Sequence, residues 1–144
     1  MTAASSIFGP MLTVIVLTLV VWVYMFARRI PFIQRSNLTP EQFQPRTFAE
    51  LQPPEVSNPS DNLKNLFELP VIFYALCLYL FVTHTVDGAQ VALAWGFAVL
   101  RIAHSLVHCT FNHVVTRFAI YAASSVCLWG MVALAGWRYL SGSP

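Results

Sequence analysis

Four long apolar stretches alternate with polar segments along the chain, and each stretch is about as long as a helix that crosses a membrane. They cover residues 7–27, 63–82, 91–110 and 115–140. A helix that crosses the hydrocarbon core of a bilayer needs roughly 20 largely apolar residues. The pattern therefore predicts an all-α integral membrane protein, a single domain of four transmembrane helices packed as a bundle.

The segment 28–61 is the one long polar stretch, and prolines interrupt it repeatedly. They are Pro31, Pro40, Pro45, Pro53, Pro54 and Pro59. Proline has no backbone N–H and disrupts the interior of a helix. We therefore predict a connecting loop over 28–61, whereas Asp87-Gly88 predicts a tight turn between the second and third helices.

Composition agrees with a membrane protein and excludes two other classes. Hydrophobic residues make up 57% of the chain and charged residues 10%, against roughly 25% charged residues in soluble domains. The net charge of +2 and the dispersed arginines exclude a nucleic-acid-binding surface. Cys77, Cys109 and Cys127 lie in or beside apolar stretches without CxxC spacing, which favours packed thiols over a disulfide framework.

Positive side chains indicate how the protein is oriented in the membrane. Those near the long polar segment are Arg28, Arg29, Arg35, Arg46 and Lys64, and Arg117 begins the fourth helix at the same level. Only Arg138 lies at the opposite end. Because Lys and Arg are enriched in cytoplasmic loops, we expect 28–61 in the cytoplasm, with both termini and the Asp87 turn on the outer side.

Polar side chains recur at helical spacing in the second and third helices. The second carries Asp61, Asn65 and Glu68, and the third carries Arg101, His104 and His108. Intervals of three or four residues place side chains on one face of a helix. Ionisable groups within a span cost roughly 2.5 to 3.5 kcal/mol each and usually face partners or water. We therefore predict that both stripes and Arg117 converge on one polar site at the cytoplasmic end.

Two structural interpretations of these residues compete with a binding site. A Glu68–Arg101 ion pair would fix the register of two helices and bind nothing. Arg117 alone would be an anchor whose charged end extends to the membrane surface.

A metal site is a further alternative. His104 and His108 have the i, i+4 spacing of two metal ligands, with Glu68 as a possible third. Ser105 stands where a HExxH protease has its glutamate. Because a histidine inside a membrane more often hydrogen-bonds a carboxylate or a carbonyl oxygen, we expect no metal.

Three short motifs occur in order along the last three helices. They are Asn65-Leu66-Phe67-Glu68-Leu69-Pro70, Arg101-x-x-His104 and Arg117-x-x-x-Tyr121. In this combination the sequence resembles the MAPEG family, the membrane-associated proteins in eicosanoid and glutathione metabolism. The resemblance covers all four helices and is greatest to the bacterial branch, which implies the bacterial inner membrane.

The resemblance implies a homotrimer that holds glutathione between neighbouring subunits at the cytoplasmic end. The residues expected to bind glutathione are Asn65, Glu68, Arg101, His104, His108 and Tyr121. Arg117 matches the arginine that faces the thiol and is the expected catalytic residue. A cation beside a thiol favours the nucleophilic thiolate, which would attack a lipophilic electrophile from the membrane or reduce a lipid peroxide.

The sequence departs from the family pattern at three positions. Asp61 stands where the fuller motif has an arginine, His108 where a tyrosine is common, and Phe118 where some members have a serine after the catalytic arginine. These departures favour a competing hypothesis, a non-catalytic membrane scaffold or lipid-binding protein of the same fold.

Overall fold

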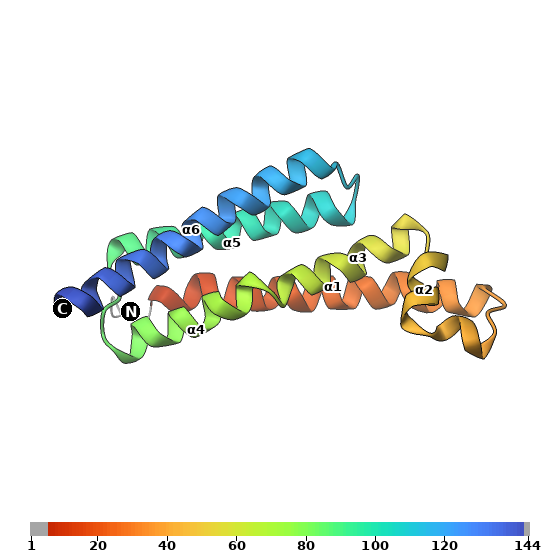
Figure 1. Ribbon diagram of the computed structural model, residues 1–144, viewed down its shortest axis with the longest axis horizontal. Helices are drawn as coiled ribbons and strands as arrows, with labels where there is room; N and C mark the ends of the chain where they lie inside the picture. Colours follow the sequence, from red (N-terminus) through yellow and green to blue (C-terminus); the bar gives the residue numbers. More distant parts are fainter. Residues whose placement is uncertain (1–5, 143–144) are drawn as a thin grey trace.

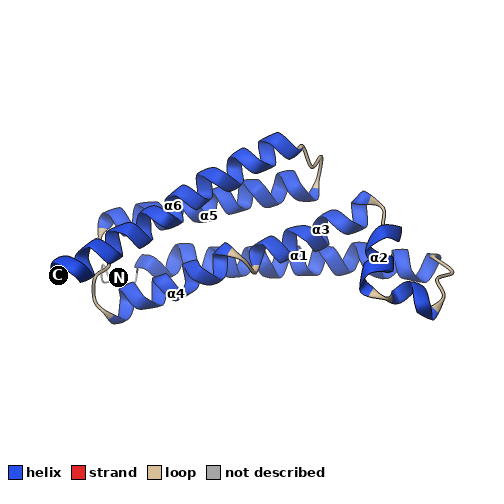
Figure 2. Ribbon diagram, in the orientation of Figure 1, coloured by secondary structure: helices blue, strands red, loops and turns tan. Residues whose placement is uncertain are grey.

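The computed structural model describes residues 6–142, and its regular elements over that range are all helices (Figures 1 and 2). In chain order they are α1 (Phe8–Arg35), the short 3₁₀ helix η2 (Pro40–Phe43), α2 (Pro45–Leu51), α3 (Pro54–Leu66), α4 (Leu69–Val82), α5 (Gly88–Cys109) and α6 (Val114–Ser141). Four helical stretches are long and apolar enough to cross a membrane: Phe8–Arg35, Pro54–Val82, Gly88–Cys109 and Val114–Ser141. The all-α class and the four spans are thus as predicted.

The four spans run lengthwise beside one another (Figure 1). The start of α1, the end of α6 and the α4–α5 turn lie at one end of the molecule. At the other end, the last turns of α1 and the short helix α2 extend beyond the α5–α6 turn. The predicted grouping of both termini with the Asp87 turn is therefore present, while the side of the membrane that each end faces stays a prediction.

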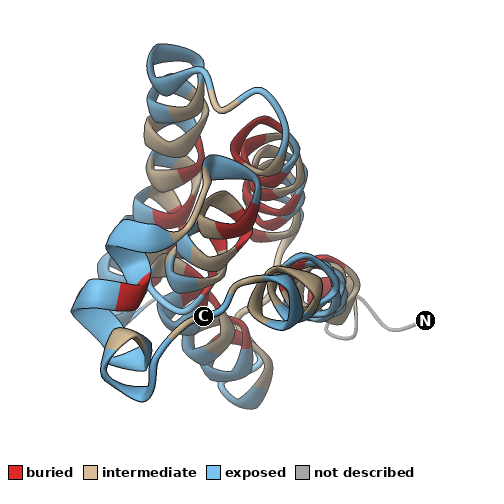
Figure 3. Ribbon diagram, turned by 90° about the vertical axis from the view of Figure 1, so that its right-hand side faces the viewer, coloured by how far each residue is buried: buried red, intermediate tan, exposed pale blue. Residues whose placement is uncertain are grey.

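The core lies where all four spans face inward, and Figure 3 shows the buried positions on these inner faces. Val14, Phe73, Phe97 and Leu128 are fully buried in one cluster, and the rings of Phe73 and Phe97 lie 4.5 Å apart. Outward-facing side chains are also apolar, for example Val126, which is 72% exposed. Such a surface suits contact with lipid or with another subunit.

The segment 28–61 is mostly helical, so the prediction of a loop was wrong in its local structure. Helix α1 continues to Arg35, and η2, α2 and α3 begin at Pro40, Pro45 and Pro54. Proline is well suited to the first position of a helix, because the N–H it lacks has no partner there and its φ angle is already helical. These prolines therefore start helices.

The second span is interrupted between α3 and α4. The N–H of Phe67 bonds to the carbonyl oxygen of Lys64 at 2.9 Å, and Glu68 has a non-helical backbone. Pro70 has no N–H to offer the carbonyl oxygen of Leu66, so the helical ladder cannot continue through it. The prediction that Glu68 shares one helix face with Asp61 and Asn65 was therefore wrong.

A polar contact joins α4, α5 and α6 at the end where α6 finishes. The Asp87 carboxylate accepts a bond from the N–H of Gln90 at 2.7 Å and thereby caps α5. Arg138 of α6 forms an ion pair with the same carboxylate and donates to the carbonyl oxygen of Thr85 at 3.0 Å. The Gln90 N–H bond and then Arg138 hold the pKa of Asp87 below its usual value. We call this group the Asp87 latch.

Candidate functional site

Helix α3 presents a row of asparagines to α5. The side-chain N–H of Asn62 donates to Cys109 Sγ at 3.4 Å, and Ser105 Oγ donates to Asn62 Oδ1 at 3.4 Å. Asn65 lies 3.4 Å from Nδ1 of His108. Asn62 is completely buried, which explains why its amide is bonded on both sides. These contacts fix the register of α3 against α5.

Arg117, near the start of α6, is the centre of a second set of contacts. Its Nη1 lies 3.0 Å from His108 Nε2 and donates to Asn112 Oδ1 at 2.7 Å. Asn112 in turn donates from Nδ2 to Asn58 Oδ1 of α3 at 2.9 Å. Asn112 has a φ of +45°, in the left-handed region that asparagine tolerates better than most residues. The α5–α6 turn thereby connects Arg117 to α3.

The proton on His108 follows from its neighbours. Arginine can only donate, so Nε2 of His108 must accept from Arg117, and the ring proton lies on Nδ1. Asn65 then fits by turning its amide oxygen towards Nδ1, since the two ends of the amide exchange by a flip. A protonated ring would place an N–H against the N–H of Arg117. His108 is therefore a neutral acceptor that orients Arg117.

Arg101 is fully buried on α5, between two aromatic rings. Its guanidinium carbon lies 5.1 Å from the ring centre of Phe97 and 4.5 Å from that of Tyr121. None of its side-chain nitrogens has a hydrogen-bond partner among residues 6–142. A buried cation without a directly bonded counter-ion is costly. An anion that bonded to these nitrogens would therefore be favourable.

Glu68 and Arg101 do not form a direct ion pair, although the Glu68 carboxylate still attracts the Arg101 guanidinium at longer range. In the described part of the chain the ion pairs are Lys64–Asp61 and Arg138–Asp87. Glu68 lies at the break between α3 and α4, where its side chain is exposed. The break moves Glu68 out of the helical register from which the pairing was predicted.

His104 completes the buried part of the site. Its Nδ1 lies 3.2 Å from the carbonyl oxygen of Arg117, which accepts the bond. The proton is therefore on Nδ1, and Nε2 is an acceptor. Nε2 is buried and has no partner within the described range. The ring of His104 lies 5.7 Å from that of Tyr121, so a free acceptor and the free donors of Arg101 flank the same tyrosine.

Most of the predicted site residues are therefore brought together. Asn65, Arg101, His104, His108, Arg117 and Tyr121 form two connected groups between α3, α5 and α6, while their roles towards a ligand stay predictions. Among the residues described, His104, His108 and Glu68 do not form a group able to hold a metal.

Of the asparagines in this region, Asn65 was predicted from the sequence, whereas Asn58, Asn62 and Asn112 were not. Asn58, Asn62 and Asn65 have the spacing i, i+4, i+7 that marks one face of a helix, so this row was visible in the sequence. Asn112 was not, because its contact with Arg117 depends on the backbone of the α5–α6 turn.

The fold and these contacts define a four-span membrane protein with a polar, partly unsatisfied site near one end of the bundle. A profile of the MAPEG family matches residues 7–137, nearly the whole chain, and the protein belongs to this family. No curated protein and no solved structure gives a significant match. Family and fold together make the chain an integral membrane protein.

Proposed function

We propose that the protein binds glutathione or a related thiol at the polar site between α3, α5 and α6. The unpaired guanidinium of buried Arg101 is the observation that carries this proposal. Glutathione offers carboxylates that would supply the missing counter-charge, and amide and amine groups that would donate to Nε2 of His104. Membership of the MAPEG family supports this choice among small anions.

Arg117 is the proposed catalytic residue. One of its terminal nitrogens is held by His108 and Asn112, which fixes the plane of the guanidinium. The side chain is only partly buried, and its Nε and Nη2 form no hydrogen bond with other residues in the described range. These donors would favour the thiolate form of the ligand. The thiol proton leaves to solvent, and the sulfur then attacks the electrophile while a leaving group departs.

The second substrate would be lipophilic and would enter from the membrane. A nearly wholly apolar groove of about 440 Å³ runs between α1 and α5, lined by side chains that include Leu17, Val20, Ile102 and Leu106. Ser105 and Cys109, which contact Asn62, also line this groove. An apolar electrophile or a lipid peroxide in this groove would therefore lie beside the asparagine row.

The functional unit would be a homotrimer in the inner membrane of a bacterium. The support is the large apolar outer surface, which includes Val115 at 71% exposed and Trp137 at 72% exposed.

A non-catalytic scaffold or lipid-binding protein is the alternative, and two observations favour it. Asp61, at the position of a family arginine, is paired with Lys64 at 2.8 Å. Phe118, which follows Arg117, is 68% exposed and apolar. The first removes a cation expected to meet a carboxylate, and the second removes a hydroxyl from the neighbourhood of the thiol.

A glutathione titration of the detergent-purified protein, followed by a conjugation assay with a lipophilic electrophile, separates these functions. We expect binding at millimolar glutathione or below, the thiolate absorbance of the bound ligand at neutral pH, and measurable conjugation. Binding without turnover would favour the scaffold. No binding at millimolar concentration would contradict the proposed function.

A further inference from the structure

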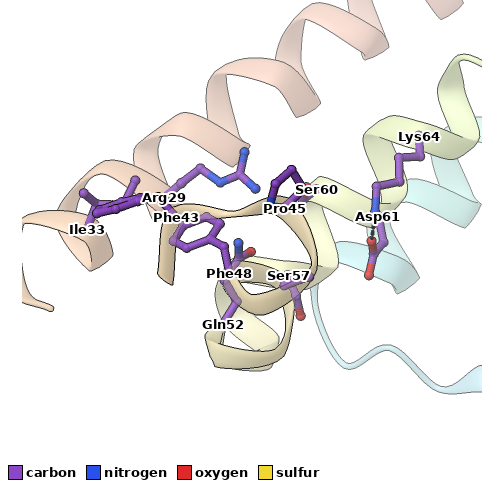
Figure 4. Close-up of a pocket in the computed structure, with 11 residues that line it drawn as sticks. Arg29, Ile33, Phe43, Pro45, Phe48, Gln52, Ser57, Ser60, Asp61 and Lys64 are labelled. Carbon is purple, nitrogen blue, oxygen red and sulfur yellow. Dashed lines mark hydrogen bonds and ion pairs between the residues drawn. The ribbon is translucent and has the colours of Figure 1, made fainter. Parts of the chain in front are cut away.

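A second cavity lies against a different face of α3. It has a volume of about 440 Å³, within the range of small-molecule sites, and is enclosed by the end of α1, the segment from η2 to α2, and α3 (Figure 4). Its lining includes Arg29, Phe43, Phe48, Ser57, Ser60 and Lys64. We call it the Arg29 pocket.

Apart from Asp61, which stands at the position of a family arginine, the lining of the Arg29 pocket is distinct from the thiol site. Ser57, Ser60 and Lys64 lie on one face of α3, whereas Asn58 and Asn62 lie on the neighbouring face and contact the α5–α6 turn and α5. The pocket also lies against α2, in the part of the molecule that extends beyond the α5–α6 turn (Figure 1). A ligand here would be held by groups that the proposed thiol chemistry does not use.

The charges that line the pocket favour an anion. Arg29 and Lys64 are positive and Asp61 is negative, so the lining carries a net charge of 2 − 1 = +1. The Asp61 carboxylate is already paired with Lys64 Nζ at 2.8 Å. Arg29 has no acidic partner; its guanidinium lies 5.2 Å from the ring centre of Phe48, and its Nε is buried without a hydrogen-bond partner among the described residues.

The remaining lining suits an amphiphilic ligand with several acceptor oxygens. Ser57 and Ser60 line the cavity from α3, while Arg29 lines it from α1. Phe43 and Phe48 form an aromatic wall, with ring centres 5.7 Å apart and an interplanar angle of 26°. Donors from different directions suit a tetrahedral phosphate better than a planar carboxylate. Arg29 stands where the apolar run of α1 ends, the level at which lipid headgroups are found.

We propose that the Arg29 pocket binds a phosphate ester, with Arg29 bonded to phosphate oxygens, the two serine hydroxyls donating to the others, and the aromatic wall covering the attached carbon chain. Two sources share this chemistry, the headgroup of an anionic phospholipid and a soluble phosphate ester.

Lipid retention by the full-length protein in detergent, measured by native mass spectrometry, tests this proposal. The probes are phosphatidylglycerol and phosphatidylcholine with identical acyl chains. We expect phosphatidylglycerol to be retained more, and Arg29→Gln to reduce its retention about tenfold, because the variant loses the charged hydrogen-bond donor to the phosphate. Arg46→Gln is the matched control, since Arg46 is exposed on α2 and does not line the pocket.

The other outcomes decide between the sources or overturn the proposal. If millimolar glycerol phosphate displaces phosphatidylglycerol, the pocket is assigned to a soluble ester. If it does not, the pocket is assigned to a lipid headgroup. Equal retention of the two lipids, equal losses in both variants, or displacement by glutathione would overturn the proposal. If Arg29→Gln does not fold, the double variant Ser57→Ala/Ser60→Ala takes its place. Unchanged retention of phosphatidylglycerol by this double variant would also overturn the proposal.

Discussion

At the scale of single residues, Arg117 depends on neighbours that hold it from two sides. His108 accepts from it, and Asn112 accepts from it while bonding to α3. The histidine stands where the family commonly has a tyrosine, yet its neutral ring still offers an acceptor. The position of the guanidinium is thus fixed by a turn and two helices together.

Replacing Arg117 should reduce thiol chemistry more than thiol binding. In Arg117→Ala the cation that favours the thiolate is lost, so we expect the thiolate absorbance of bound glutathione to disappear at neutral pH while much of the affinity remains. Arg117→Lys keeps a charge without the planar fork, and partial recovery would show that charge matters more than geometry. Conjugation by Arg117→Ala at the wild-type rate would contradict the catalytic assignment.

Asn112 should act through Arg117. Glycine fits the left-handed backbone at this position, so Asn112→Gly removes the amide without backbone strain. We expect a lower thiolate absorbance at saturating glutathione and a loss of about 1 kcal/mol in unfolding free energy. Asn112→Asp keeps an acceptor for Arg117 and should restore most of the absorbance. A wild-type signal in Asn112→Gly would show that His108 alone positions the arginine.

Replacing Arg101 should stabilise the ligand-free protein but weaken its binding of glutathione. Methionine is similar in length and apolar, so Arg101→Met removes an unpaired buried cation, and the ligand-free protein should gain at least about 1 kcal/mol in unfolding free energy. Its melting temperature should then no longer rise with added glutathione. A destabilised Arg101→Met protein would mean that the assembled protein itself supplies a counter-ion.

At the scale of helices, prolines explain both what the sequence predicted and what it did not. Apolar length was enough to predict four spans. The positions of Pro40, Pro45 and Pro54 at helix starts were missed because a proline disfavours the interior of a helix but suits its first turn. Pro70 likewise lies in the first turn of a helix, α4, and it marks a break where periodicity alone continued one helix through Glu68. Pro31 and Pro59 lie inside α1 and α3. Side chains within unbroken helices, such as Arg101 and His104, were placed together correctly.

The Asp87 latch should make the stability of the α4–α5–α6 end depend on pH. The pKa of Asp87 is lowered in the folded protein, so its stabilising effect is present above the unfolded-state pKa of about 3.9 and is lost as the pH falls through the lower folded-state value. In Asp87→Asn the side-chain amide oxygen can still accept the hydrogen bond from the N–H of Gln90. At neutral pH we expect the unfolding free energy of wild type to exceed that of Asp87→Asn by about 1 kcal/mol or less. In acid this difference should vanish.

Thermal unfolding of wild type, Asp87→Asn and Arg138→Gln across the acid range measures this effect. Asp87→Asn should show a flattened pH dependence, because it has no carboxylate to titrate. Arg138→Gln should keep part of the pH dependence, because the N–H of Gln90, the largest cause of the lowered pKa of Asp87, still bonds to the carboxylate. A difference from wild type that stays constant below pH 4 would argue that the latch acts through its shape and not through its charge.

At the scale of the whole molecule, the end of the bundle that carries α2 should face the cytoplasm, since most cations lie there. Glu50 on α2 and Ala89 at the start of α5 are both exposed and at opposite ends. In intact cells, an impermeant maleimide should label Ala89→Cys and leave Glu50→Cys unlabelled until the cells are opened. The reverse pattern would invert the topology.

The interruption between α3 and α4 has a mechanical consequence. Helical hydrogen bonding makes a span stiff, and the second span loses that continuity at Phe67 and Glu68. The second span therefore consists of two helices with a break between them. Helix α3 carries both the asparagine row and one wall of the Arg29 pocket, whereas α4 packs in the core. A tilt of α3 at the break would move both binding surfaces together while α4 keeps its place in the core.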